Sequence, residues 1–111
     1  MIIAIPVANE LLCMHFGHCQ TFRLFEVDDN NTIVKVEDKV PPPHEPGVLP
    51  KWLGELNVNL VIAGGMGMRA QQLFTQAGVK VLTGASGDDP QKVVEAFLAN
   101  TLETGDNVCD H

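Results

Sequence analysis

The strongest constraint on the fold is a short apolar run at residues 58–63, VNLVIA, which is followed directly by two glycines. A run of this length is too short for a typical helix and is characteristic of a strand that is buried on both faces. Strands of this kind occur in parallel sheets that helices cover on both sides. The run therefore predicts an α/β fold.

The rest of the chain supplies the other elements of such a fold. TFRLFEVD and TIVKVED alternate in polarity around a DDNN turn, which predicts an antiparallel hairpin. The predicted strands are residues 1–7, 21–28, 32–38, 58–63 and 79–83. The predicted helices are residues 49–56, 68–77 and 90–99, the last capped by Asp88 or Asp89 with Pro90 in its first turn. Residues 8–19 are predicted as a loop and residues 41–47 as a proline-stiffened connector. We expect an α/β sandwich with a mixed sheet of about five strands, one of them antiparallel.

Length and charge exclude several classes of protein. A chain of 111 residues fits a single domain, here residues 1–99, followed by a flexible tail at residues 100–111. The net charge of -7 and the absence of a basic run argue against nucleic-acid binding. No apolar stretch approaches the roughly 20 residues of a membrane span. Pro6 interrupts the apolar N-terminus, and three cysteines suit thiols or ligands better than a disulfide framework, so a reducing cytoplasm is expected.

The segment LLCMHFGHCQTF, residues 11–22, concentrates side chains that bind metals. Cys13, His15, His18 and Cys19 offer the thiolate and imidazole ligands of zinc, copper and iron–sulfur centres. Their spacing within one loop does not match a zinc finger, and better fits a loop that holds part of an exogenous cluster. Burial of the two cysteines as small apolar side chains is the alternative.

A second candidate is the turn GGMGMRA at residues 64–70, between a predicted strand and a predicted helix. Backbone amides and the positive helix end could face an anion there, with Arg69 adding charge. The candidate residues are Gly64, Gly65, Met66, Gly67 and Arg69. Glycines that permit close strand–helix packing, and a methionine that fills the core, are the alternatives. The spacing matches a dinucleotide fingerprint, but the next strand does not end in the acidic ribose ligand.

Three more potential ligands lie elsewhere. His44 stands in the rigid PPPHEPG connector, where it could join the site or be an exposed turn residue. Cys109 and His111 end the polar tail and could complete a site, or belong to an ordinary disordered terminus.

HFGHCQTFRLFEVD, VNLVIAGGMGMRAQQLF and GVKVLTG, in this order, resemble the dinitrogenase iron–molybdenum cofactor biosynthesis family. The family includes NifX-like carriers, the C-terminal domain of NifB and orange-protein-like members, and this chain looks like a stand-alone small-protein branch. The resemblance implies a ribonuclease-H-like three-layer fold and a carrier of preformed metal–sulfur clusters. It also implies that His15 contacts the cofactor and that donor and acceptor proteins exist. The cargo could be an Fe–S, Fe–Mo or Mo–Cu cluster.

Catalysis is not expected, because the chain lacks clustered carboxylates on its first strand, a G-x-S-x-G motif and a Walker lysine. The leading hypothesis is a small cytoplasmic carrier or scaffold for a metal–sulfur cluster. One alternative is a protein that binds a single zinc, copper or iron ion. Its ligands would be Cys13, His18, His44, Cys109 and His111. Another is an anion- or nucleotide-responsive interaction domain that uses only the glycine turn.

Overall fold

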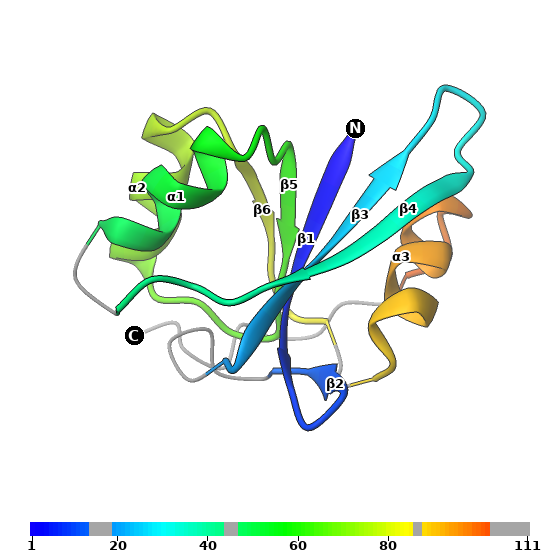
Figure 1. Cartoon of the computed structure of the whole chain (residues 1–111), viewed down its shortest axis with the longest axis horizontal. Helices are drawn as coiled ribbons and strands as arrows, with labels where there is room; N and C mark the ends of the chain where they lie inside the picture. Colours follow the sequence, from blue (N-terminus) through cyan, green and yellow to red (C-terminus); the bar gives the residue numbers. More distant parts are fainter. Residues whose placement is uncertain (14–18, 44–46, 86–87, 103–111) are drawn as a thin grey trace.

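The computed structural model describes residues 1–13, 19–43, 47–85 and 88–102. Within them the strands are β1 (Ile2–Ala8), β2 (Leu11–Leu12), β3 (Thr21–Val27), β4 (Ile33–Lys39), β5 (Leu60–Ile62) and β6 (Lys80–Leu82). The helices are α1 (Val48–Glu55), α2 (Met68–Gln76) and α3 (Pro90–Leu98) (Figure 1). The predicted α/β class is confirmed, and all five predicted strands and three predicted helices are present with small shifts at their ends.

The described strands form one mixed sheet in the order β4-β3-β1-β5-β6. β1, β5 and β6 run parallel, while β3 runs antiparallel to both β1 and β4. The predicted single antiparallel strand on this path is therefore β3. β2 lies off the path and pairs antiparallel with the end of β1, which makes it the sixth strand.

Helices cover both faces of the sheet, so that the molecule has three layers (Figure 1). α1 and α2 pack on one face, around a buried cluster that includes Ala4, Leu53 and Phe74. α3 packs on the other face, around a cluster that includes Ile3 and Val94. Successive side chains of a strand point to opposite faces, so β1 contributes to both cores.

β3 shows how this double burial alters a sequence pattern. Phe22 and Leu24 belong to the core under α1 and α2, whereas Phe25 and Val27 belong to the core under α3. Phe25 breaks the expected alternation of apolar and polar residues because both faces of β3 carry apolar side chains.

The prediction that residues 8–19 form only a loop was wrong at its start. Asn9 and Glu10 have positive φ values of 54° and 68°, and they join β1 to β2 in a two-residue turn. Positive φ at both central residues is typical of the tight turn that suits the twist of a hairpin. A two-residue strand carries no periodic pattern, so β2 could not be predicted from the sequence.

None of the helices in the described part of the chain is long and apolar enough to cross a membrane.

Candidate functional site

Three chain segments meet at one edge of the sheet, where β1, β5 and β6 end. The carboxyl ends of parallel strands lie at the same edge, so the segments that follow Ala8, Ile62 and Leu82 converge there. The Gly84 N–H donates to the Gly64 carbonyl at 2.8 Å, which ties the turn after β6 to the turn after β5. The two candidate turns therefore begin from the same edge.

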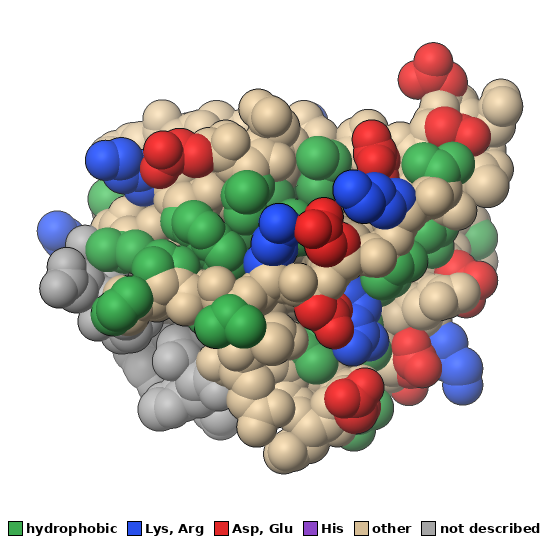
Figure 2. All heavy atoms as spheres, in the orientation of Figure 1, with side chains coloured by type: hydrophobic (Ala, Val, Ile, Leu, Met, Phe, Trp, Pro, Cys, Tyr) green, Lys and Arg blue, Asp and Glu red, His purple; other side chains and the backbone are tan. Residues whose placement is uncertain are grey.

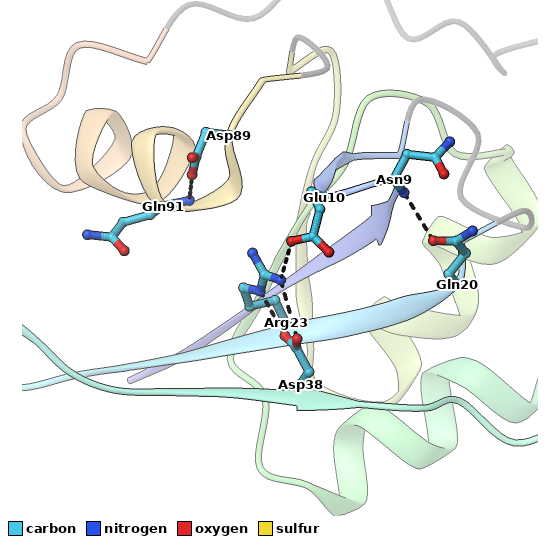
Figure 3. A network of polar contacts seen from close by, with 7 residues as sticks. All are labelled: Asn9, Glu10, Gln20, Arg23, Asp38, Asp89 and Gln91. Atoms are coloured by element: carbon cyan, nitrogen blue, oxygen red, sulfur yellow. Dashed lines mark hydrogen bonds and ion pairs between the residues drawn. The ribbon is translucent and has the colours of Figure 1, made fainter.

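The cysteine- and histidine-rich segment is anchored at both ends on β1. The Cys13 N–H donates to the Pro6 carbonyl at 2.7 Å, and the Gln20 N–H donates to the Val7 carbonyl at 2.8 Å. The Gln20 side chain also accepts from the Asn9 N–H at 3.0 Å (Figure 3). β2 and β3 both pair with Val7, so the two described ends of the segment lie on opposite sides of β1.

The two cysteines of this segment within the described residues differ in exposure. Cys13 is buried, whereas Cys19 is half-buried, and both carry thiols rather than a disulfide. Burial, with a smaller contribution from the nearby Cys13, raises the pKa of the Cys19 thiol to about 11. The thiol is therefore protonated at neutral pH, and a metal would have to displace its proton.

Five predicted ligands, His15, His18, His44, Cys109 and His111, lie outside the described residues. These include every histidine of the sequence. Among residues 1–13, 19–43, 47–85 and 88–102, no three His, Cys, Asp or Glu side chains gather in a way that could hold a metal ion. The ligand set thus stays a prediction.

The glycine turn reaches the same edge from β5. Gly64 and Gly65 are buried, and Met66 is 1% exposed. Met66 lies in the core under α1 and α2, against which Cys19 also packs. The cysteine segment and the glycine turn therefore share one buried cluster.

The start of α2, like that of α1, has a glycine at its N-cap and no side-chain cap. Its N-cap residue is Gly67, no side chain caps the helix, and no acidic residue stands in its first turn. α3, in contrast, is capped by Asp89, whose carboxylate accepts from the Gln91 N–H at 2.9 Å (Figure 3). The first-turn amides of a helix have no intrahelical acceptor and carry partial positive charge. The amide end of α2 thus lacks the anionic cap that α3 provides for itself.

Neither packing nor backbone conformation requires a glycine at position 67. Its φ of -64° and ψ of 155° are open to any residue. A Cβ built at this position would meet no heavy atom of the described residues within 4 Å. Close strand–helix packing therefore does not explain Gly67, which leaves open space beside the amide end of α2. Arg69, in the first turn, is exposed and makes no ion pair within the described part of the chain.

A model of the family described as dinitrogenase iron-molybdenum cofactor matches residues 1–100. The chain belongs to this family. The expected relationship is therefore confirmed over nearly the whole chain.

Several proteins are similar to this family member in sequence or structure. The uncharacterized protein MJ0580 of Methanocaldococcus jannaschii is 26% identical over 109 residues, covering 93% of this chain and 90% of that protein. The crystal structure of PH0822 superposes with a TM-score of 0.86 at 28% identity, covering 94% of both chains. The apo form of the orange protein from Desulfovibrio gigas superposes with a TM-score of 0.73 at 21% identity, covering 96% of this chain and 93% of that one. At 21% identity, the similarity to the orange protein shows a shared fold and nothing more.

The edge also contains an ionic clamp that the sequence did not reveal. The Arg23 guanidinium donates to both carboxylate oxygens of Asp38, at 2.7 and 3.3 Å, and lies 3.7 Å from the Glu10 carboxylate (Figure 3). The hydrogen bond to Asp38 is the main reason that the pKa of Arg23 is raised. Arg23 and Asp38 join β3 to β4, and the exposed Glu10 of the β1–β2 turn lies beside them in this family member.

A surface hollow of about 500 Å³ lies away from this edge. It is lined by Asn31, Thr32, Ile33, Gln91, Glu95, Leu98 and Ala99. These residues come from the β3–β4 connection, the start of β4 and α3, and none of them belongs to the candidate turns.

Proposed function

We propose that the protein is a carrier or scaffold that binds an anionic metal–sulfur cluster as cargo at the carboxyl edge of β1 and β5. The observation that carries the proposal is the uncapped amide end of α2, which has open space at Gly67 and follows Met66, the residue whose core cluster Cys19 also contacts. Membership of the dinitrogenase iron-molybdenum cofactor family supports cofactor assembly or delivery as the role.

The chemistry of the edge suits an anionic guest that must be released again. Amide N–H groups and the positive helix end attract sulfide-rich anions without forming bonds to the metal. Arg69 adds a positive charge on the same helix turn. Because the Cys19 thiol is protonated, it carries no negative charge that would repel the anion. In this proposal few strong protein–metal bonds form, and His15 provides a metal contact.

The remaining expectations belong to the same proposal. The strand order, with β3 antiparallel between β4 and β1, supports a ribonuclease-H-like classification of the fold. A carrier requires donor and acceptor proteins and needs no catalytic residues. A cytoplasmic location is part of the proposal, because three cysteines suit thiols or ligands better than a disulfide framework.

The proposal is tested by anaerobic reconstitution with iron, sulfide and molybdate, followed by desalting and metal and sulfide analysis. Wild-type protein should retain a coloured, stoichiometric species, and His15→Ala should lose it. Failure of the wild type to retain such a species would remove the proposal. A bound metal without acid-labile sulfide would instead favour the single-ion alternative.

Gly67 offers a matched pair of variants that isolates the amide end of α2. Gly67→Asp and Gly67→Asn both introduce good N-cap side chains of similar size, so both should fold at least as stably as wild type. Only aspartate adds a negative charge, and two unit charges 4 Å apart interact by roughly 1–4 kcal/mol near a protein surface. We expect cluster retention to fall by about tenfold or more in Gly67→Asp relative to Gly67→Asn. Retention equal to that of wild type in both variants would exclude this helix end from the site.

A further inference from the structure

We propose that two copies of this chain associate through the outer edge of β4, as an antiparallel strand pair around a twofold axis at Val36. β4 is the last strand on its side of the sheet within the described chain. The exposed edge of a sheet presents main-chain N–H and C=O groups that can pair with another strand. The inference concerns association and does not depend on the cluster-binding proposal.

The hydrogen bonds of β3 define which main-chain groups of β4 face outward. The Val27 N–H donates to the Met1 carbonyl at 2.8 Å, and the Met1 amino group donates to the Val27 carbonyl at 3.0 Å. The direction of the main-chain N–H and C=O groups alternates from one residue of a strand to the next. The main-chain groups of Phe25, two residues before Val27, therefore also point towards β1. Val36 lies opposite Phe25 and is therefore in a non-hydrogen-bonded pair with β3. The N–H and C=O of Val36 thus point away from the sheet, as do those of Asp38 two residues later.

The side chains of this edge are unusually apolar for a solvent-facing strand. Val34 is 57% exposed and Val36 is 48% exposed. In a pair centred on Val36, the two Val36 side chains lie directly opposite each other. Val34 of each copy lies opposite Asp38 of the other copy and diagonal to its Val36. Association would therefore bury valines that the single chain leaves exposed. The register irregularity opposite Val27 lies at the beginning of β4, away from this centre.

The charges of β4 select this register. Glu37 lies 3.6 Å from Lys35 and 3.0 Å from Lys39, which places the three side chains on one face and lowers the pKa of Glu37. Figure 2 shows acidic and basic side chains next to each other over β3 and β4. In the Val36-centred pair, Lys35 of each copy lies opposite Glu37 of the other. If one strand is shifted by two residues relative to the other, Lys35 of one copy lies opposite Lys35 of the other. A shift by two residues in the opposite direction places Glu37 opposite Glu37, so both alternative registers bring like charges together.

Lysines on an edge strand commonly prevent pairing with other chains. Here the basic and acidic residues alternate along one face, so that the strand complements itself in one register instead of repelling every partner. The occupant that matches this pattern is a second copy of the same strand.

Sedimentation equilibrium from low to high micromolar concentration tests the association. The average mass of wild type should rise towards twice the 12.0 kDa of one chain. Val36→Pro removes an N–H that faces outward, and proline is tolerated at such edge positions, so this variant should keep its fold and stay at the mass of one chain. Val36→Thr, which keeps the β-branch and the N–H, is the matched control and should associate.

A wild type that stays at the mass of one chain at every concentration would overturn the proposal, as would Val36→Pro that associates like wild type. If Val36→Pro fails to fold by circular dichroism, Val36→Lys replaces it. That variant keeps the N–H but sets two positive charges on the twofold axis, and undiminished association would again contradict the proposal.

Cross-linking tests the register. With oxidised glutathione, Val36→Cys should give a disulfide between the two introduced thiols, identified by peptide mapping that separates it from the native cysteines. Glu37→Cys should give no such bond, because its two thiols would be offset along the strands. A linked Glu37→Cys pair, or no linked Val36→Cys pair, would exclude the Val36-centred register.

Discussion

Cys19 is the described side chain at the candidate edge whose ionisation the fold alters most clearly. Its thiol is half-buried and lies near Cys13, and these surroundings raise its pKa to about 11. Because alkylation requires the thiolate, we expect the alkylation rate of Cys19 to keep rising with pH up to about 11. The measurement is iodoacetamide labelling across pH, with fragment mass spectrometry to separate Cys13 from Cys19.

The control for this experiment is the same labelling in denaturant, where Cys19 should show the ordinary midpoint of about 8.5. A midpoint near that value in the folded protein would contradict the inferred burial of the thiol. A neutral Cys19 in the folded state also means that a metal bound there releases a proton.

Individual residues show which features near the candidate site could be predicted from the sequence and which could not. The glycine turn and the cysteine segment could be placed together, because both follow strands of one predicted sheet. The open space beside Gly67 could not be predicted, because it depends on which side chains do not reach that position. The bond between Gly84 and Gly64 and the Arg23 clamp join residues far apart in the chain, and no local pattern signals them.

At the scale of elements, the long strands and the helices were predictable because each buries a repeating set of apolar side chains. β2 was not, since its pairing with β1 depends on turn geometry and not on a pattern. Its Asn9–Glu10 turn uses a conformation that normally favours glycine at the second position. The hairpin therefore carries local strain that the sequence does not display.

Glu10→Gly should relieve this strain. A residue with a Cβ pays roughly 1–2 kcal/mol in the left-handed region, whereas an exposed ion pair such as that of Glu10 with Arg23 contributes about 0–1 kcal/mol. We expect the free energy of unfolding to rise by about 0.5–1 kcal/mol, measured by urea titration. Glu10→Ala is the matched control, since it removes the ion pair but keeps the Cβ, and it should not be more stable than wild type. Equal stability of Glu10→Gly and Glu10→Ala would show that the turn is unstrained.

At the scale of the whole molecule, one sheet separates two cores, and the central strand β1 joins them. Ile5 is fully buried in the core under α3, whereas Ala4 belongs to the core under α1 and α2. Trp52, the single tryptophan, lies on the α1 and α2 side, where its ring meets the ring of Phe22 edge-to-face at 5.7 Å. Trp52 fluorescence therefore reports on the core under α1 and α2. Substitutions in the core under α3 lie on the opposite face of the sheet from Trp52.

Ile5→Val tests whether the two cores unfold together. Loss of one buried methylene group costs about 0.5–1.5 kcal/mol, and the shared strand should transmit the whole loss to both faces of the sheet. Urea unfolding of this variant followed by Trp52 fluorescence and by far-ultraviolet circular dichroism should shift to the same lower midpoint. An unchanged fluorescence midpoint with a lowered circular dichroism midpoint would mean that α3 and its core unfold separately. In that case the β2 hairpin, which the Leu12 N–H ties to the Asp88 carbonyl just before α3, would be stabilised independently of the glycine turn.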